Sequence, residues 1–281
     1  DKRMTIIAES GSTKTNWLTE DKQLFETIGF NPLFHTPDSI YHEMLKHDEL
    51  HGKRHQFTKV FFYGASCSSP ERNKIISDAM GKFFDKAEVI QVDHDLKAAA
   101  IATYTGSTGI ACILGTGSNS CLYDGKDIYE EVPSLGYALG DEGSGAWFGK
   151  KLLSLYLYKE LPQATTDLMR DKYGLHKELI FENVYKKPYP NVYLASFAKI
   201  MTESHDVAFM EGIAKEGFNE FFKHHVCCYQ NYVQYPVHFV GSIAFFYKDV
   251  LQRVAMDYSC QLGIVDRNPV YRLLEWHLKS A

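Results

Sequence analysis

The sequence lacks several features that would assign it at once to a class of protein. No apolar run reaches the roughly 18 residues of a membrane-spanning helix. Positive charge is not in excess: the net charge is −5, so neither a nucleic acid nor an anionic membrane is expected as a partner. The start of the chain has no signal-peptide layout, with Met4 as a candidate native start, and we therefore expect a cytoplasmic protein. Any anionic ligand must be held by local geometry.

Cysteines in metal-binding or disulfide patterns are also absent. The six cysteines include no Cys-x-x-Cys pair, and a chain of 281 residues does not need disulfides to fold. We expect reduced thiols, most of them buried. His224 and His225 stand beside Cys227 and Cys228, but neighbouring residues on a helix point to different faces. A metal site is therefore not predicted there.

The first part of the chain alternates strand-like and helix-like segments and then repeats its opening. We predict strands at 5–8, 16–19, 23–29, 60–63 and 88–92, and helices at 38–50, 70–84 and 95–104, with Asp38 as an N-cap. Strands at 109–114, 121–123 and 127–131 repeat the order of strand, glycine-bearing turn and return strand. Each opening is typical of a β-hairpin, and the repeat indicates an internal duplication.

From Gly140 onward helices dominate. We predict helices at 143–159, 167–172, 176–185, 191–203, 207–233 and 243–262, a strand at 237–240, a short one at 264–265 and a terminal helix that begins at Pro269. No proline- or glycine-rich linker and no low-complexity segment interrupts the chain. The pattern favours an α/β protein with two packed domains and a cleft between them.

Two glycine-bearing turns are candidates for anion binding. The first is the run ESGSTKT at residues 9–15, which follows a strand and offers accessible N–H groups, hydroxyls and a lysine. The second is GTGSN at 115–119, where two glycines allow close approach of a phosphate. Either could be an ordinary hairpin turn. Neither has the spacing of a Walker P-loop or of a dinucleotide fingerprint.

Two acidic clusters are the other candidates. The run GDEGSG at 140–145 opens a helix, so Asp141 and Glu142 are either helix-capping residues or part of a ligand-facing loop. Asp93 and Asp95 precede an alanine-rich helix. They are either N-cap residues or carboxylates at the carboxyl end of a strand, where α/β sheets place their ligands.

The order and spacing of these clusters resemble a known family. The run LGTGSN at 114–119, followed by Gly136 and by LGDEGS at 139–144, is similar to the N-acetylglucosamine kinase and BadF-type ATPase family. That family belongs to the superfamily of sugar kinases, actin and heat-shock-chaperone ATPases. The run VGSI at 240–243 resembles its adenosine motif, and the similarity extends from Ile6 to about Leu262.

The resemblance implies two ribonuclease-H-like domains that close over MgATP and an amino sugar. The domains would be residues 1–106, joined by the C-terminal helix 269–281, and residues 107–268 with a helical insertion. The implied activity is an ATP-dependent kinase that phosphorylates an amino sugar, N-acetylglucosamine, at its primary hydroxyl. The helical stretch 161–233 shapes either the sugar cleft or the surface of a homodimer.

The family's site residues are carried over position by position. The phosphate-binding and nucleotide-binding positions are Gly11, Ser12, Thr13, Lys14, Gly115, Thr116, Gly117, Ser118, Gly241 and Ser242. The sugar-binding positions are Asn31, Asp95, Thr116, Gly117 and Asp141. Asp95 is the implied general base, with Asp93 as the alternative, and Glu9 is the implied Mg²⁺ residue, acting through water.

One departure from the family pattern leaves an alternative function open. Glu9 stands where the family usually has aspartate, and Mg²⁺ tolerates poor octahedral geometry badly. A non-catalytic protein that binds sugar and ATP therefore remains an alternative. A second alternative comes from the family itself, which includes BadF-type ATPases that drive a partner protein by conformational change.

Overall fold

The computed structural model describes residues 2–280, which divide into two compact units. The first unit contains residues up to Thr105 and, in addition, the stretch from Asn268 onward, whereas the second runs from Gly106 to Arg267. None of the helices among the described residues is both long and apolar enough to cross a membrane.

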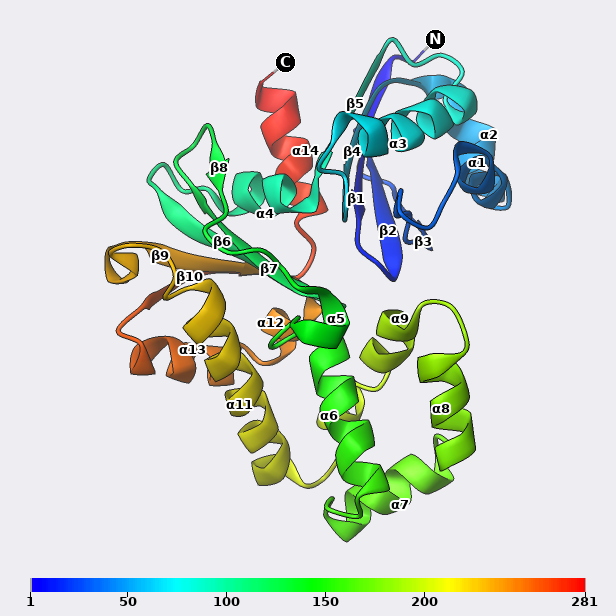
Figure 1. Cartoon of the computed structure of the whole chain (residues 1–281). Coiled ribbons are helices and arrows are strands. Elements are labelled where there is room, and N and C mark those ends of the chain that lie inside the picture. The colour runs from blue at the N-terminus through cyan, green and yellow to red at the C-terminus, as the bar shows by residue number, and fades with distance from the viewer. Residues whose placement is uncertain (1, 281) are drawn as a thin grey trace. The chain divides into compact units, whose positions relative to one another are not determined.

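The first unit is a five-stranded sheet with helices on both faces (Figure 1). Its strands are β1 (Met4–Ser10), β2 (Lys14–Thr19), β3 (Leu24–Ile28), β4 (Phe57–Gly64) and β5 (Val89–His94). Its helices are α1 (Pro37–Leu45), α2 (Asp48–Lys53), the 3₁₀ helix η1 (Arg54–Gln56), α3 (Pro70–Phe83), α4 (Asp95–Thr103) and α14 (Val270–Lys279). The strand order is β3-β2-β1-β4-β5, antiparallel across β1–β3 and parallel across β1, β4 and β5.

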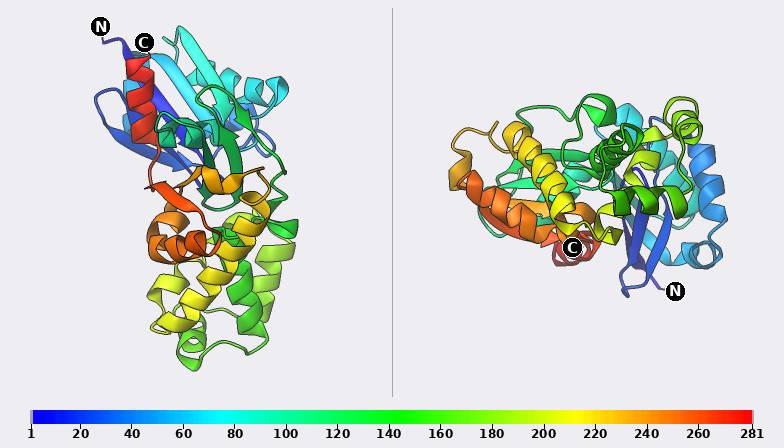
Figure 2. Two further views of the ribbon diagram at one scale, coloured as in Figure 1. Left: turned by 90° about the vertical axis from the view of Figure 1, so that its left-hand side faces the viewer. Right: turned by 90° about the horizontal axis from the view of Figure 1, so that it is seen from below.

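Alternation along the strands assigns the two faces of this sheet. Ile6, Ala8 and Phe62 are fully buried in one core with residues of α1 and α3. The opposite face carries α4 and α14, and α14 packs there although the whole second unit precedes it in the sequence (Figure 2). On that face His277 of α14 stacks on Phe61 at a centroid distance of 3.9 Å.

The second unit repeats the same strand order. Its strands are β6 (Gly109–Leu114), β7 (Ser118–Tyr123), β8 (Ile128–Tyr129), β9 (Pro236–Val240) and β10 (Gln261–Asp266), in the order β8-β7-β6-β9-β10. Its helices are α5 (Gly136–Leu139), α6 (Gly145–Leu157), α7 (Gln163–Asp171), α8 (Lys177–Tyr185), α9 (Pro190–Ala195), α10 (Ile200–Glu203), α11 (Val207–His225), η2 (Tyr232–Gln234), α12 (Ser242–Phe246) and α13 (Lys248–Asp257). The two sheets therefore confirm the duplicated α/β fold.

Aromatic side chains fill the core of the second unit. Phe148 of α6, three residues of α11 and Phe239 of β9 are all fully buried; the α11 residues are Phe218, Phe221 and Phe222. Burying a side chain of this size contributes on the order of 2–3 kcal/mol. The long α11 is thus fixed between the sheet and α6.

The predicted helix 38–50 is wrong, because the chain forms two helices there. Thr36 rather than Asp38 caps α1, and it exchanges hydrogen bonds with Ser39 in a capping box. Asp38 instead pairs with Lys82 of α3 at 2.7 Å. His47 accepts a hydrogen bond from the N–H of Leu50 and so starts α2.

Three further helix predictions are too long. The prediction 207–233 fails because α11 ends at His225, whose carbonyl oxygen accepts the Ser120 hydroxyl at 2.6 Å instead of continuing the helix. The prediction 243–262 fails because Tyr247 lies outside helical geometry and the chain then turns into β10, which also replaces the short strand expected at 264–265. The segment 191–203 is likewise split into α9 and α10.

The expectation for the cysteines is confirmed. All six are free, and four of them are buried: Cys67, Cys112, Cys121 and Cys260. In the described part of the chain, no group of three or more metal-ligating side chains is arranged to hold an ion.

The buried His277 predicts how stability depends on pH. Its Nε2 lies 2.7 Å from the Tyr63 hydroxyl, and burial lowers the pKa of His277 to about 4. An unfolded histidine titrates near 6.5, so between these values the unfolded chain binds a proton that the folded chain does not. The free energy of unfolding should therefore fall by up to about 3 kcal/mol from this group as the pH drops from 6.5 to 4.

The substitution His277→Gln removes the titration and keeps a partner for Tyr63. Urea unfolding at pH 7.5 and 5.0 should show a smaller loss of stability for this variant than for the wild type. His42→Gln is the control, because His42 is exposed. An equal loss in all three proteins would contradict the prediction.

Candidate functional site

The first turn, residues 11–14 between β1 and β2, is held tightly by the end of β3. The N–H of Gly11 donates to the carbonyl of Lys14 at 3.0 Å, and the N–H of Gly29 donates to the carbonyl of Thr13 at 3.1 Å. A Cβ at position 29 would lie 2.2 Å from the carbonyl oxygen of Gly11. Only glycine fits this contact, so Gly29 positions the first turn, a role that the sequence pattern did not indicate.

Asn31 follows directly after this contact. The Ser10 hydroxyl accepts the N–H of Phe30 at 3.0 Å, which fixes the segment leading to Asn31. The Oδ1 atom of Asn31 accepts the N–H of Leu33 at 2.9 Å. Its Nδ2 has no hydrogen-bond partner in the described structure, so this amide is the group that Asn31 can offer to a ligand.

The remaining residues of the first turn lie at the surface. Ser12 is half-buried, whereas Thr13 and Lys14 are exposed. The Lys14 ammonium is 3.8 Å from the Glu26 carboxylate. An exposed pair at this distance contributes little to stability, so Lys14 can leave it for a stronger anion.

The carboxyl ends of β1, β4 and β5 bring acidic residues to one edge of the first sheet. Glu9, Tyr63 and Asp93 occupy one row across the three strands, so alternation places them on the same face. Asp93 is exposed, and its Oδ1 accepts the backbone N–H of His94 at 2.8 Å.

Asp95 lies two residues further on, at the start of α4. Its side chain is 18% exposed, and its Oδ1 is 3.2 Å from Nε2 of His94. Burial raises the pKa of the Cys67 thiol to about 12, and the nearby charges of Asp95 and Asp93 act in the same direction. Both carboxylates therefore lie close to Cys67, but neither caps α4 through its side chain, since the N-cap position is His94.

The second turn, residues 115–118 between β6 and β7, is bonded to the start of α6. The N–H of Gly145 donates to the carbonyl of Gly115 at 2.7 Å, and the N–H of Ala146 donates to that of Thr116 at 3.1 Å. In a trans peptide the N–H points opposite to the C=O. The N–H groups of Thr116 and Gly117 are therefore directed away from α6, as an anion-binding turn requires.

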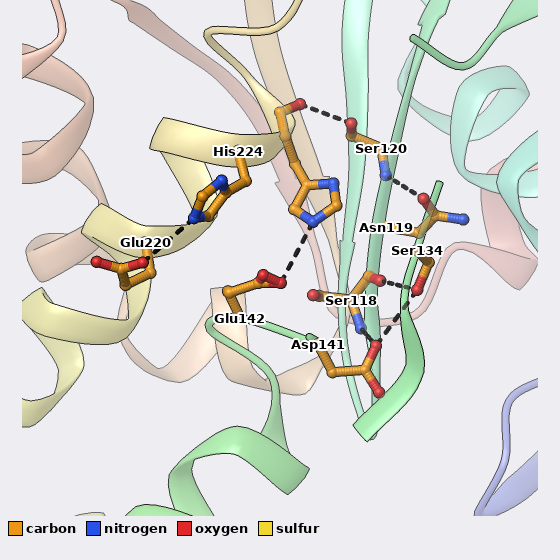
Figure 3. Close-up of polar contacts among 9 residues, drawn as sticks. Ser118, Asn119, Ser120, Ser134, Asp141, Glu142, Glu220 and His224 are labelled. Atoms are coloured by element: carbon orange, nitrogen blue, oxygen red, sulfur yellow. Dashed lines mark hydrogen bonds and ion pairs between the residues drawn. The ribbon is translucent and has the colours of Figure 1, made fainter. Parts of the chain in front are cut away.

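Asp141 is the carboxylate closest to the second turn (Figure 3). Its Oδ1 accepts the N–H of Ser118 at 3.1 Å and the hydroxyl of Ser134 at 3.4 Å. Its Oδ2 has no hydrogen-bond partner among residues 2–280. Burial raises the pKa of Asp141, while the hydrogen bonds from Ser118 and Ser134 act in the opposite direction. Ser134 was not predicted, because no motif surrounds it.

The capping interpretation of Asp141 and Glu142 is wrong. Ser144 caps α6 by accepting the N–H of Trp147 at 3.1 Å. Asp141 has a left-handed backbone with φ of 53°, which is uncommon for a residue with a side chain. The loop 140–144 therefore presents its carboxylates to other parts of the unit.

Gly241 packs against the strand that leads into the second turn. Its φ is 117°, and a Cβ there would lie 2.2 Å from the carbonyl oxygen of Leu114. Its N–H donates to Asp266 at 3.0 Å, and the exposed Ser242 starts the short α12. The second unit thus brings three predicted segments together: residues 115–118, Asp141 and Gly241.

The comparisons with known proteins agree with this architecture. The chain is 37% identical to a proposed N-acetylglucosamine kinase from Porphyromonas gingivalis, with a TM-score of 0.90 over 98% of this chain and 99% of that one. A second proposed N-acetylglucosamine kinase, from Chromobacterium violaceum, is 15% identical with a TM-score of 0.68 over 98% of both chains.

A third comparison concerns the fold alone. MreB 5 of Spiroplasma citri bound to AMPPNP is 11% identical, with a TM-score of 0.55 over 100% of this chain and 98% of that one. The chain therefore has the two-domain fold of the actin-like ATPases. No protein-family model and no curated protein sequence matches it.

The close approach at Gly241 predicts a strong effect of substitution. Gly241→Ala should destabilise the protein by at least about 2 kcal/mol, because the methyl group meets a backbone oxygen and the backbone is left-handed. Gly115→Ala is the control, since a Cβ there would meet nothing within 4 Å, and it should cost less than about 1 kcal/mol. Urea unfolding measures both values, and equal costs would refute the packing argument.

Proposed function

The chain belongs to the sugar-kinase family that includes the proposed N-acetylglucosamine kinase of Porphyromonas gingivalis, and from this we propose that it transfers the γ-phosphoryl group of ATP to an amino sugar. The acceptor we propose is the primary hydroxyl of N-acetylglucosamine. The observation that carries the proposal is the 37% identity over the full chain, together with a glycine-bearing turn at the same place in both sheets.

The two turns are the proposed phosphate-binding elements. The outward N–H groups of Thr116 and Gly117 supply fixed dipoles without a charged side chain, which suits a protein of net charge −5. The Ser118 hydroxyl is buried and has no hydrogen-bond partner in the described structure, so it has capacity for a phosphate oxygen. In the first turn, Gly11, Ser12, Thr13 and Lys14 have the matching role, and Gly241 and Ser242 lie where the adenosine is proposed to bind.

Polar groups with unused capacity are the proposed sugar contacts. Hydroxyl groups of a sugar can donate to Oδ2 of Asp141 and accept from Nδ2 of Asn31. Asp95 is the proposed general base: it would accept the proton of the primary hydroxyl as the oxygen attacks phosphorus. Phosphoryl transfer depends mainly on positioning and on neutralisation of charge.

The residues present fit a hydrated Mg²⁺ ion. Magnesium keeps several waters and binds through substrate phosphates and one or two carboxylates, so it needs no dedicated cage of side chains. Glu9, at the end of β1 and next to the first turn, is the proposed carboxylate and would act through water. When bound, the ion would neutralise charge on the phosphates.

The direct test is a coupled assay of ADP release against a panel of hexoses and amino sugars. N-acetylglucosamine should give the highest kcat/KM, with phosphate appearing on its primary hydroxyl. ADP release that does not depend on any sugar would favour the partner-driving ATPase. Binding of sugar and ATP without turnover would favour the non-catalytic alternative.

The role of Asp95 gives a second prediction. Asp95→Asn should lower kcat at least about a hundredfold, the usual scale for a general base, and leave sugar binding measured by calorimetry nearly unchanged. Asp93→Asn is the matched control, two residues earlier, and should retain most of the activity. If Asp93→Asn alone abolishes turnover, the base is Asp93, and if neither variant is impaired, neither residue is the base.

A further inference from the structure

A buried pair of ionisable residues lies beside the proposed sugar contact and has no role in the mechanism above. Glu142 directly follows Asp141 (Figure 3), and its carboxylate is 3.5 Å from Nε2 of His225 at the end of α11. The two side chains are only 13% and 4% exposed. Apart from this contact, Oε1 of Glu142 and Nδ1 of His225 are buried without a hydrogen-bond partner in the described structure.

Neighbouring residues hold His225 in place in the second unit. Its ring stacks on Phe221 at a centroid distance of 5.3 Å. Its carbonyl oxygen accepts the Ser120 hydroxyl at 2.6 Å, and that hydroxyl is also 3.0 Å from the hydroxyl of the buried Tyr229. Both the ring and the backbone of His225 are therefore held by neighbours that do not belong to the loop 140–144.

The loop 140–144 needs a contact with a residue that is itself held in place. Asp141 has a left-handed backbone, which persists in a residue with a side chain only where the surroundings impose it. On the C-terminal side, Gly143 abuts the carbonyl of Gly217 in α11, where a Cβ would lie 3.1 Å away. Among the described residues, the contact with His225 is the only polar contact from the side chain of Glu142 to α11.

These contacts form a closed set that begins and ends at Asp141. From Asp141 the chain leads to Glu142, which contacts His225, and His225 is bonded to Ser120 of β7. Two residues earlier in β7, the N–H of Ser118 donates back to the Asp141 carboxylate. Each member of this closed set of contacts therefore helps to define where the Asp141 carboxylate lies relative to the second turn.

We propose that Glu142 and His225 are positioning residues, which hold Asp141 so that its free oxygen faces the sugar. The proposal rests on the function proposed above only in making Asp141 the sugar contact. The fixing of Asp141 by the pair stands on the geometry alone, and the two parts can be tested separately.

The chain supplies a matched control on the same helix. His224, the residue before His225, is 3.4 Å from Glu220, and this pair has the same chemistry. Its side chains are 48% and 38% exposed, and neither takes part in the closed set of contacts around Asp141. His224→Gln therefore removes a histidine–glutamate contact from α11 without touching Asp141.

The activity test compares Glu142→Ala, Glu142→Gln, His225→Gln and His224→Gln. Glu142→Ala should raise the KM for the sugar about tenfold or more, with kcat and the KM for ATP within about threefold of the wild type, since a sugar contact is lost and the chemistry is not. Glu142→Gln retains an oxygen for His225 and should have most of the sugar affinity of the wild type. His225→Gln should lie between these two, and His224→Gln should match the wild type.

Hydrogen exchange tests the positioning without any activity. The N–H groups of Ser118 and Ser144 both donate to Asp141, one to the carboxylate and one to the carbonyl. In Glu142→Ala both amides should exchange at least about tenfold faster, whereas amides in the core of β6 should not change. Glu142→Gln should exchange like the wild type.

The outcomes separate the two proposals. Unchanged exchange at Ser118 and Ser144 in Glu142→Ala would overturn the positioning role, whatever the kinetics. Faster exchange in a protein that phosphorylates no sugar would support the positioning role and refute the proposed function. A loss of ATP affinity as large as the loss of sugar affinity would show that the pair only stabilises the unit and would also overturn the proposal.

Discussion

Two hydrogen bonds at the start of α6 organise the second unit. The first N–H groups of a helix have no partner within the helix, and here Gly145 and Ala146 donate theirs to the carbonyl oxygens of Gly115 and Thr116. The turn is thereby fixed to the helix, and the N–H groups of Thr116 and Gly117 point away from α6. The loop 140–144 must close the connection in the space that is left, which accounts for the left-handed backbone of Asp141 and the glycine at position 143.

The first unit reaches a comparable turn by a different contact. No helix N-terminus follows its hairpin. Instead, Gly29 at the end of β3 lies against Gly11, and its N–H donates to the carbonyl of Thr13. The two sheets share one strand order, yet the turns are held by a helix in one case and by a strand end in the other. The duplication is therefore one of topology, and the contacts that position the turn differ between the two units.

The sequence was sufficient for the hairpins, the two sheets and the helices α3, α4 and α6, because these depend on local periodicity and turn residues. The predictions failed where tertiary contacts override the local preference for helix. The end of α11 is set by the Ser120 hydroxyl, about a hundred residues away in the chain, and the break at Tyr247 depends on where β10 has to run. In the site, glycine-rich motifs were visible in the sequence, whereas Gly29, Ser134 and His225 stand in no motif and are identified only by what they contact.

The proposed function requires the second turn to bind a phosphate and to hold a carboxylate, and these two roles conflict if they fall on the same atoms. A carboxylate repels a phosphate that binds beside it, yet Asp141 lies within hydrogen-bonding distance of this turn, where we propose that phosphate binds. The N–H of Ser118 points to Asp141 and is already used, so only the N–H groups of Thr116 and Gly117 face outward. One end of the turn therefore fixes the Asp141 carboxylate, and the other end is the one that we propose binds the phosphate. Burial raises the pKa of Asp141, and the hydrogen bond from the Ser118 N–H acts against that rise, so the turn stabilises the carboxylate that the proposed function uses to bind the sugar.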